Sequence, residues 1–395
     1  AAVRERAKLD GEPQAELAAL VDLGRVEHRL GHADAADRTW SDARALASTF
    51  ADPLAAHRID LLRAMLAVER NDRELAERLY AGAEPVLERA GAFAELSEIR
   101  RGRALAAMRR GEPSSEEKLL LEAIDLAERA GDASGLAKAH NNLAIAYTRA
   151  RRFRDSEQHF LRARELHASL GARTSVAIVE LNLGGLYYHE LMDLERARAV
   201  YQSALRTFEQ TGHARGTAAV LTSLGALDLV GARPRDAIAH LDAAIALWTE
   251  TRDTTHLAYT VHLRAMAGLD AGEPLEPVAR AVARHLELTG PVPPPIARVR
   301  CAAGALRLAV RDPDARADAV GLIAALDAYS ERVGPEDGAA PALLEAARAA
   351  RTRGEHDLAR AWALRALELP DAGPLAPRRE LEQLAGLAAR SERPN

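Results

Sequence analysis

The stretch HNNLAIAYTRARRFRDSEQHFLRA, residues 140–163, decides the fold of this chain. Its apolar residues Leu143, Ala146 and Tyr147 lie three and four positions apart, which is the spacing of one face of an amphipathic helix. A polar turn around Arg151 follows, and a second helical pattern begins after it. The stretch therefore predicts two consecutive helices, here called helix A and helix B, joined by a short turn.

This pair of helices returns along the chain with a period of 40 or 41 residues. Each helix A carries a small residue at one fixed position, and each helix B carries a bulky residue followed three positions later by alanine. Small residues let two helices approach closely, and the bulky residue fills the space beside that contact. The small residues are Gly24, Ala64, Ala104, Ala144, Gly184, Gly225, Ala265 and Ala305; the bulky ones are Trp40, Tyr80, Leu120, Phe160, Tyr201 and Leu241; the alanines are Ala43, Ala83, Ala123, Ala163, Ala204 and Ala244.

Turn residues recur with the same period. Helix A is expected to end at Gly31, Asn71, Gly111, Arg151, Met192, Gly231, Gly272, Asp312 and Gly354, and helix B at Gly91, Gly131, Gly171 and Gly212. Glycine suits the left-handed backbone that ends many helices. One extra residue falls around Leu191–Met192. Since repeats of this length stack on their neighbours, the sequence predicts an all-α protein, an α-solenoid of antiparallel helix pairs.

The repeat resembles the tetratricopeptide repeat family. Its best units are His140–Tyr147 with Ser156, Phe160 and Ala163, and Leu183–Tyr187 with Ala197, Tyr201 and Ala204; Leu224–Gly225 and Leu23–Gly24 open two further units. The period is longer than the roughly 34 residues usual in that family, and turns with glycine replace its terminal proline. Such long repeats are similar to those of kinesin light chains and of bacterial regulatory proteins that join a switch domain to a repeat array.

The resemblance is specific over Leu17–Trp248 and weaker over Thr254–Gly290. It implies a right-handed superhelix of about eight to nine repeats, with helix A lining the concave surface.

The expected organisation has five parts. Residues 1–10 are read as helix B of a repeat that lacks its helix A, so the chain is expected to be a fragment of a longer protein with more repeats or an effector domain upstream. Residues 11–290 form the array. Residues 291–296 are a proline-rich break, because proline removes a helical donor. Residues 297–370 are divergent helical repeats, and residues 374–390 form a capping helix.

Composition excludes several classes of function. The single cysteine, Cys301, leaves no internal disulfide and no multi-cysteine metal site. The net charge of −5 gives no general attraction to nucleic acid or anionic lipid. His28 and His32 have the spacing of metal ligands on one helix, but Gly31 interrupts that helix. No phosphate loop or hydrolase motif occurs. We therefore predict a cytoplasmic protein that is not an enzyme, has no cofactor or metal, and contacts neither nucleic acid nor membrane directly.

The candidate binding residues lie on helix A. Asn141 and Asn142 share one helix A, Asn182 lies one period after Asn142, and Ser223 follows at the next equivalent position. In several peptide-binding members of the family, asparagines at this register hydrogen-bond the backbone of an extended ligand. An amide suits this task because it both donates and accepts. The alternative is that these side chains bond only to a neighbouring helix or to water.

A second set of candidates, expected on the same face, is rich in cations. Guanidinium groups bind carboxylates with two parallel hydrogen bonds, so this set predicts a groove for an acidic, extended segment. The alternative is an ordinary solvated surface. The set consists of Arg25, His28, Arg29, Arg101, Arg109, Arg149, Tyr188 and His189.

Two functions remain open. The first is a scaffold that binds a protein, an extended peptide or a domain of its own parent chain. The second is a sensor in which a small molecule or partner alters the superhelix and so controls an attached ATPase, kinase, protease or DNA-binding domain. A sensor of this kind requires an enclosed pocket. The expected place for it is Thr254–Gly290, where the units match the repeat pattern less well.

Overall fold

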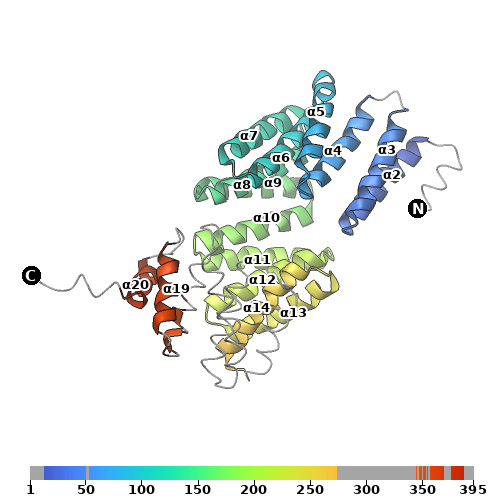
Figure 1. The fold of residues 1–395 in the computed structure, drawn as a ribbon. Coiled ribbons are helices and arrows are strands. Elements are labelled where there is room, and N and C mark those ends of the chain that lie inside the picture. The colour runs from blue at the N-terminus through green and yellow to red at the C-terminus, as the bar shows by residue number, and fades with distance from the viewer. Residues whose placement is uncertain are drawn as a thin grey trace, which may run out of the picture. The chain divides into compact units, whose positions relative to one another are not determined.

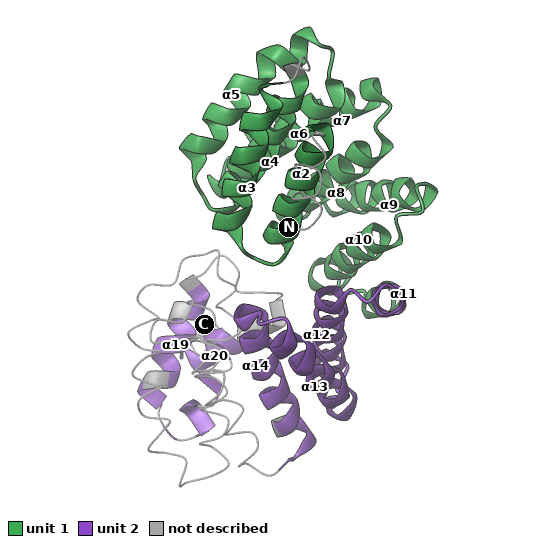
Figure 2. Cartoon of the chain, turned by 90° about the vertical axis from the view of Figure 1, so that its right-hand side faces the viewer, with its two compact units in different colours: residues 1–200 green, residues 201–395 purple. Residues whose placement is uncertain are grey.

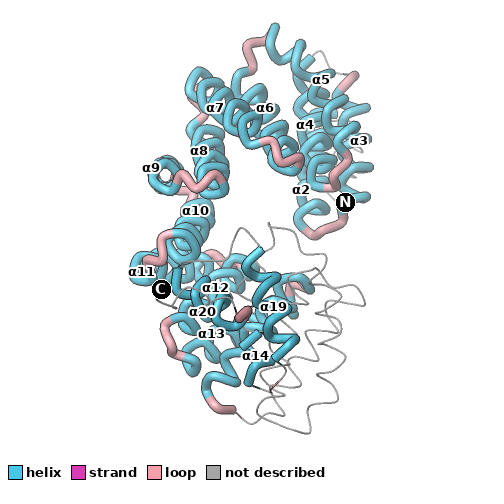
Figure 3. The backbone as a smooth tube through the Cα atoms, turned by 60° about the vertical axis from the view of Figure 1, so that its left-hand side comes forward, coloured by secondary structure: helices cyan, strands magenta, loops and turns pink. Residues whose placement is uncertain are grey.

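The computed structural model describes residues 13–49, 53–273, 344, 347–348, 350–352, 354, 356–368 and 375–386. These residues form helices joined by short turns, and no strand occurs among them (Figures 1 and 3). The all-α prediction is therefore confirmed.

The helices alternate between the two predicted types. Those of type A are α2 (Pro13–Arg29), α4 (Pro53–Glu69), α6 (Phe93–Arg109), α8 (Ala133–Arg149), α10 (Arg173–Gly185), α12 (Ala214–Val230) and α14 (Thr254–Ala271). Those of type B are α3 (Ala33–Ala47), α5 (Arg73–Arg89), α7 (Pro113–Ala130), α9 (Phe153–Ser169), α11 (Leu194–Gln210) and α13 (Pro234–Glu250). Near the C-terminus, α19 (His356–Glu368) packs against α20 (Leu375–Leu384).

The chain divides into two compact units, residues 1–200 and residues 201–395, and α11 runs through the boundary (Figure 2). Within the first unit α2, α4, α6 and α8 each pack on the B helix that follows. Some successive A helices also contact one another: α4 contacts α6, and α6 contacts α8. In the second unit, α12 contacts α14. These A helices therefore lie side by side in one layer, α4, α6 and α8 in the first unit and α12 and α14 in the second.

The predicted packing positions form the core. The alanines at the repeated helix B position, from Ala43 to Ala244, are fully buried. The bulky residues beside them are at most 2% exposed. A Cβ atom added at Gly24 would lie 2.8 Å from Cε2 of Trp40, and one at Gly225 would lie 2.7 Å from Cδ2 of Leu241. The small residue of helix A thus makes room for the bulky residue of its own helix B.

Among the described residues, the turns follow the predicted positions with one exception. Asn71, Arg151 and Met192 have φ angles of 60°, 58° and 53°, although none of them is glycine. The prediction at Gly231 is wrong by one residue. Gly231 has φ −76° and its N–H still bonds the carbonyl of Leu227, so the left-handed residue is Ala232, with φ 54°.

The extra residue near Leu191–Met192 is absorbed in the helix before it. Leu186–Glu190 forms a π-helical turn, η1, and the N–H of Leu191 bonds the carbonyl of Leu186, five residues earlier, at 3.1 Å. A single inserted residue in a helix commonly forms such a turn. The insertion therefore leaves the turn at Met192 in its repeated place and alters the end of helix A instead.

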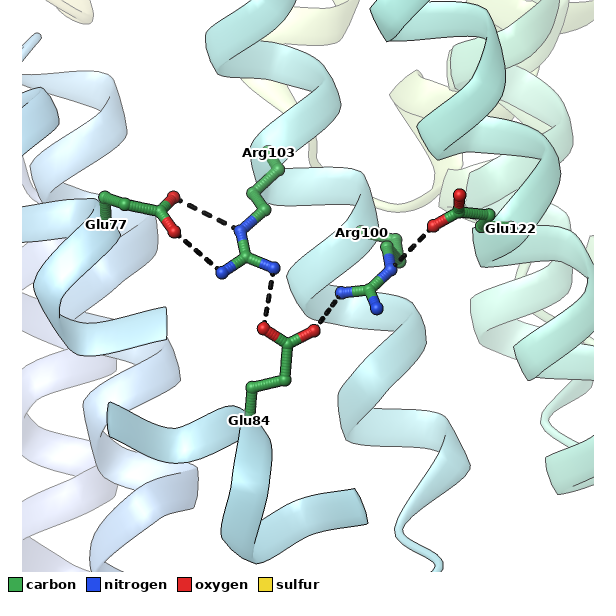
Figure 4. A network of polar contacts seen from close by, with 5 residues as sticks. All are labelled: Glu77, Glu84, Arg100, Arg103 and Glu122. Atoms are coloured by element: carbon green, nitrogen blue, oxygen red, sulfur yellow. Dashed lines mark hydrogen bonds and ion pairs between the residues drawn. The ribbon is translucent and has the colours of Figure 1, made fainter. Parts of the chain in front are cut away.

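Ion pairs link α5, α6 and α7 side by side (Figure 4). Glu84 of α5 accepts hydrogen bonds from both Arg100 and Arg103 of α6; the Arg103 contact measures 2.8 Å. Arg103 also donates to Glu77 at 2.7 Å, and Arg100 donates to Glu122 of α7 at 2.8 Å. Burial opposes ionisation of Glu84, yet the two arginines hold its pKa below the usual 4.5.

Replacing Glu84 with glutamine should lower the free energy of unfolding by about 1–2 kcal/mol at neutral pH, because two largely buried guanidinium groups lose their shared anion. A carboxyl whose pKa is depressed in the folded state stabilises the fold above its unfolded pKa, and this contribution is lost as pH falls through the folded pKa. Urea unfolding should therefore show a weaker acid dependence below about pH 4.5 in Glu84→Gln than in the wild type.

Glu165→Gln is the matched control for Glu84→Gln. Glu165 pairs with Arg162 at 3.3 Å, but both side chains are more than half exposed, so its loss should change stability little. Equal effects of the two substitutions would show that the Glu84 cluster does not stabilise the stack.

Several predictions lie outside the described residues. These are the partial repeat at residues 1–10, the proline-rich break at 291–296, Ala305, Asp312, Cys301 and most of the divergent region at 297–370. Among the helices that are described, none is both long enough and apolar enough to cross a membrane.

Candidate binding groove

The A helices of the first unit line a hollow of about 740 Å³. In the described part of the chain, its wall is formed by α2, α4, α6 and α8, together with the N-cap of α8. Leu17, Val21, Ile59, Leu62 and Met65 are among its apolar residues. The hollow therefore lies on the face that the repeat pattern assigns to helix A.

Two smaller hollows adjoin it. One, of about 580 Å³, lies over α2, α4 and Trp40; the other, of about 230 Å³, reaches from Met65 to Ile145 and Arg149. Met65 lines all three. We call the three hollows together the unit 1 groove.

Many charges in the groove are already paired. Arg25 donates to Asp22 at 3.1 Å, and Arg58 donates to Glu95 at 2.7 Å. Asp132 caps α8 by accepting from the N–H of Gly135 at 2.9 Å.

The remaining charges have no ion-pair partner within the part of the chain that the structure describes. They are the cations Arg29, Arg101 and Lys138 and the anions Glu98 and Asp132, of which Asp132 also caps α8. The groove therefore presents a mixed surface with a small excess of available cations.

Arg101 and Tyr80 meet at the 230 Å³ hollow. Nε of Arg101 and the hydroxyl of Tyr80 are both buried, and neither has a hydrogen-bond partner among the described residues. Burial, and next the nearby Glu98, raise the pKa of Tyr80, so its hydroxyl stays protonated at neutral pH. Two buried donors thus lack an acceptor at this point of the groove.

The predicted asparagines form a chain of amides across α8 and α10. Asn182 donates through Nδ2 to Oδ1 of Asn141 at 3.1 Å, and Asn141 donates to Oδ1 of Asn142 at 3.4 Å. Asn142 alone of the three lines the groove. In the second unit, Ser223 donates to the carbonyl of Ala219 at 3.0 Å, within its own helix.

The predicted arginines fall in different surroundings. Arg25, Arg29, Arg101 and Arg149 line the groove. Arg149 pairs with Glu116, whose side chain is 8% exposed. Arg109 lies instead in a separate hollow of about 170 Å³ between α5 and α6, and it donates to the carbonyl of Val68.

The remaining candidates have other neighbours. Tyr188 and His189 lie in the π-helical turn, with ring centroids 4.4 Å apart. His28 lines the 580 Å³ hollow, and its Nε2 is 2.6 Å from Oε2 of Glu69. In the described part of the chain, no three His, Cys, Asp or Glu side chains are grouped so as to hold a metal.

Sequence reasoning missed Met65, Glu98, Lys138 and the Tyr80 hydroxyl. A usable signal was present, because groove positions recur with the repeat. Arg25, Met65, Leu105 and Ile145 stand 40 residues apart and all line the groove; so do Ala18, Arg58, Glu98 and Lys138. Tyr80 occupies the same position of the repeat as Trp40 and Phe160, so the pattern indicates a packed ring. Nothing in the pattern indicates a binding role for its hydroxyl.

No family model and no curated protein matches the sequence. Solved structures do resemble it. A Rap protein complexed with Competence and Sporulation Factor aligns with a TM-score of 0.61 at 13% identity, over 93% of this chain and 99% of that one. The apo form of the quorum sensor NprR from B. thuringiensis aligns with a TM-score of 0.62 at 13% identity, over 92% of this chain and 98% of that one.

A third similar structure is a signal transduction ATPase with numerous domains that carries a tetratricopeptide repeat sensor, from Pyrococcus horikoshii. It aligns with a TM-score of 0.61 at 16% identity, over 75% of this chain and 43% of that one. Likeness at such low identity concerns the fold. Together with the repeated helix pairs and their packing positions, it shows that this chain is a helical-repeat protein with the tetratricopeptide-type fold.

Proposed function

We propose that this chain is a non-catalytic binding module whose unit 1 groove holds an extended segment of another protein or of its own parent chain. The observation that supports this most is the groove itself: A helices from four successive repeats line it, with an apolar floor and polar groups that lack partners. A groove built from successive repeats offers equivalent positions at regular steps, which suits successive residues of an extended chain.

The surface chemistry fits such a ligand. Met65, Leu105 and Ile145 offer apolar contacts one repeat apart. An extended backbone has free N–H and C=O groups, and the amide of Asn142 at the groove wall can donate to one and accept from the other. The bound segment is thus proposed to alternate apolar side chains with polar backbone contacts.

Charge favours an acidic segment. In the described part of the chain, Arg29, Arg101 and Lys138 are groove cations without an ion pair, against two such anions, Glu98 and Asp132. Guanidinium groups bind carboxylates in a geometry that adds both strength and direction. We therefore propose that the segment carries aspartate or glutamate between its apolar residues.

A second candidate is a sensor, in which binding controls an attached domain. The likeness to the Rap complex, to NprR and to the repeat sensor of the signal transduction ATPase favours it. In this version the same groove is used, and ligand binding would change the spacing of the repeats that the Glu84 ion pairs link. Ligand-induced change in amide hydrogen exchange at α9, which contributes no residue to the three hollows, would distinguish a sensor from a passive scaffold.

Selection of random displayed peptides on the purified chain tests the proposal without a known partner. We expect the enriched peptides to combine apolar residues with aspartate or glutamate, and to compete with one another for one site per chain. Enrichment of basic peptides, or of peptides that bind together without competing, would contradict it.

A further inference from the structure

The 230 Å³ hollow has the features of a separate small site within the groove. Tyr80 is 1% exposed, and its buried hydroxyl has no acceptor among the described residues. Nε of Arg101 is also buried and also lacks an acceptor there. An unsatisfied buried donor costs free energy, and natural proteins rarely keep two of them at one place. The two donors therefore indicate an acceptor that enters from outside the chain.

The backbone leaves room for that acceptor. Gly102 follows Arg101 on α6, and a Cβ atom there would lie 2.7 Å from Cζ of Tyr80 and closer still to its hydroxyl oxygen. Glycine in a helix interior is unfavourable by roughly 1 kcal/mol relative to alanine. A glycine at this position therefore indicates that packing leaves no space for a side chain. It allows the Tyr80 hydroxyl to lie against the α6 backbone beside Arg101, and Tyr80 is among the residues that line the hollow.

The charge of the lining selects the class of ligand. Arg101 is permanently protonated, and a guanidinium with a neighbouring hydroxyl suits an oxyanion. Three carboxylates also line the hollow. Glu69 is bonded to His28 and Glu116 to Arg149, whereas Glu98 is available. A doubly charged phosphate would be repelled by these groups more strongly than a singly charged carboxylate.

Apart from Gly102, Asn142 and Arg149, the rest of the wall is apolar. It consists of Met65, Val68, Ala104, Leu105, Met108, Leu120 and Ile145. A ligand that fills it must carry an apolar group close to its carboxylate. The side chains of aspartate and glutamate do not, whereas an apolar amino acid with a free α-carboxylate does.

We propose that the Tyr80–Arg101 hollow binds a monocarboxylate that carries an adjacent apolar group, with Arg101 and the Tyr80 hydroxyl donating to the carboxylate. Glu98, one helical turn before Arg101, would accept from an N–H next to that carboxylate. The same chemistry is offered by a small N-acylated apolar amino acid and by the C-terminal residue of a protein segment. Only the second source depends on the proposed function of the groove.

Matched probes separate the chemistry from its source. N-acetyl-leucine and N-acetyl-leucinamide share one apolar body, but only the first has a carboxylate. We expect isothermal titration to show at least about tenfold tighter binding of the acid. If the source is a protein segment, a peptide that ends in leucine should bind more tightly with a free C-terminus than with an amidated one, by a similar factor. If the source is a small molecule, the two forms of the peptide should bind with equal affinity.

Substitutions then assign the donors. Arg101→Met should weaken binding of N-acetyl-leucine by about tenfold or more, and Tyr80→Phe by about threefold or more. Because Tyr80→Phe removes an unsatisfied donor and keeps the ring, the free protein should be as stable as the wild type or more stable. Tyr147→Phe is the control: its hydroxyl donates to Glu117 at 3.0 Å and is absent from the groove wall, so stability should fall and affinity should stay.

Equal binding of the acid and the amide would overturn the proposal, and so would unchanged affinity in both Arg101→Met and Tyr80→Phe. A selected peptide that binds equally well with a free and an amidated C-terminus, while Met65→Lys abolishes its binding, would leave the groove as the binding surface and remove only the carboxylate site.

Discussion

Replacing Gly24 with alanine is expected to lower the free energy of unfolding by about 2 kcal/mol or more, although alanine is the better helix former. The added Cβ would lie 2.8 Å from Cε2 of Trp40 and closer still to two other atoms of the indole. Trp40 is 2% exposed and its Nε1 donates to the carbonyl of Val21 at 3.2 Å, so the ring has little space to move. The substitution therefore forces the two helices of the first repeat apart.

Gly82→Ala is the matched control. Gly82 also lies inside a helix, α5, but a Cβ there would meet nothing within 4 Å. This substitution should raise stability by about 0.5–1 kcal/mol, through helix propensity and reduced freedom of the unfolded chain. Urea unfolding followed by helical circular dichroism should thus give opposite signs for the two glycines. Stabilisation by both would contradict the role of Gly24 in packing.

The packing of the repeats could be predicted because it is local and periodic. Each small residue of helix A meets the bulky residue of the same repeat, as Gly24 meets Trp40 and Gly225 meets Leu241. A contact between residues 16 apart, repeated along the chain, leaves a signal in a single sequence. The left-handed turn residues are predictable for the same reason, except where Ala232 takes the place expected for Gly231.

The groove could be predicted only in part, because pairing between charges depends on neighbouring repeats. The sequence marks Arg109 and Arg149 as cations, but it does not show that one bonds the Val68 carbonyl and the other Glu116. These partners stand 41 and 33 residues away, and the choice depends on rotamers and on the spacing of the helices. Likewise, the π-helical turn at Leu186–Glu190 places Tyr188 and His189 on an altered end of helix A, which the period alone does not predict.

Replacing Met65 with lysine is expected to weaken binding of a selected peptide by about a hundredfold, because a charge without a partner would be buried under the ligand at the centre of the apolar floor. Met65 lines all three hollows of the groove. It is 37% exposed in the free chain, so the lysine can stay solvated there and the stability should change by no more than about 0.5 kcal/mol. The substitution therefore changes the affinity for the peptide without changing the stability of the fold.

Leu121→Lys provides the control for this change in charge and shape. Leu121 lies on α7, a B helix of the same unit, and is 48% exposed. It contributes to none of the three hollows of the groove. A general effect of an added positive charge on an acidic peptide would appear equally in both variants, whereas a direct effect of the groove appears only at position 65.

The most direct measurement is isothermal titration of one selected acidic peptide into the wild type, Met65→Lys and Leu121→Lys at the same ionic strength. Binding on the A-helix face predicts that affinity falls about a hundredfold in Met65→Lys and is kept in Leu121→Lys. Equal affinities for all three proteins would contradict the assignment of the unit 1 groove as the binding surface.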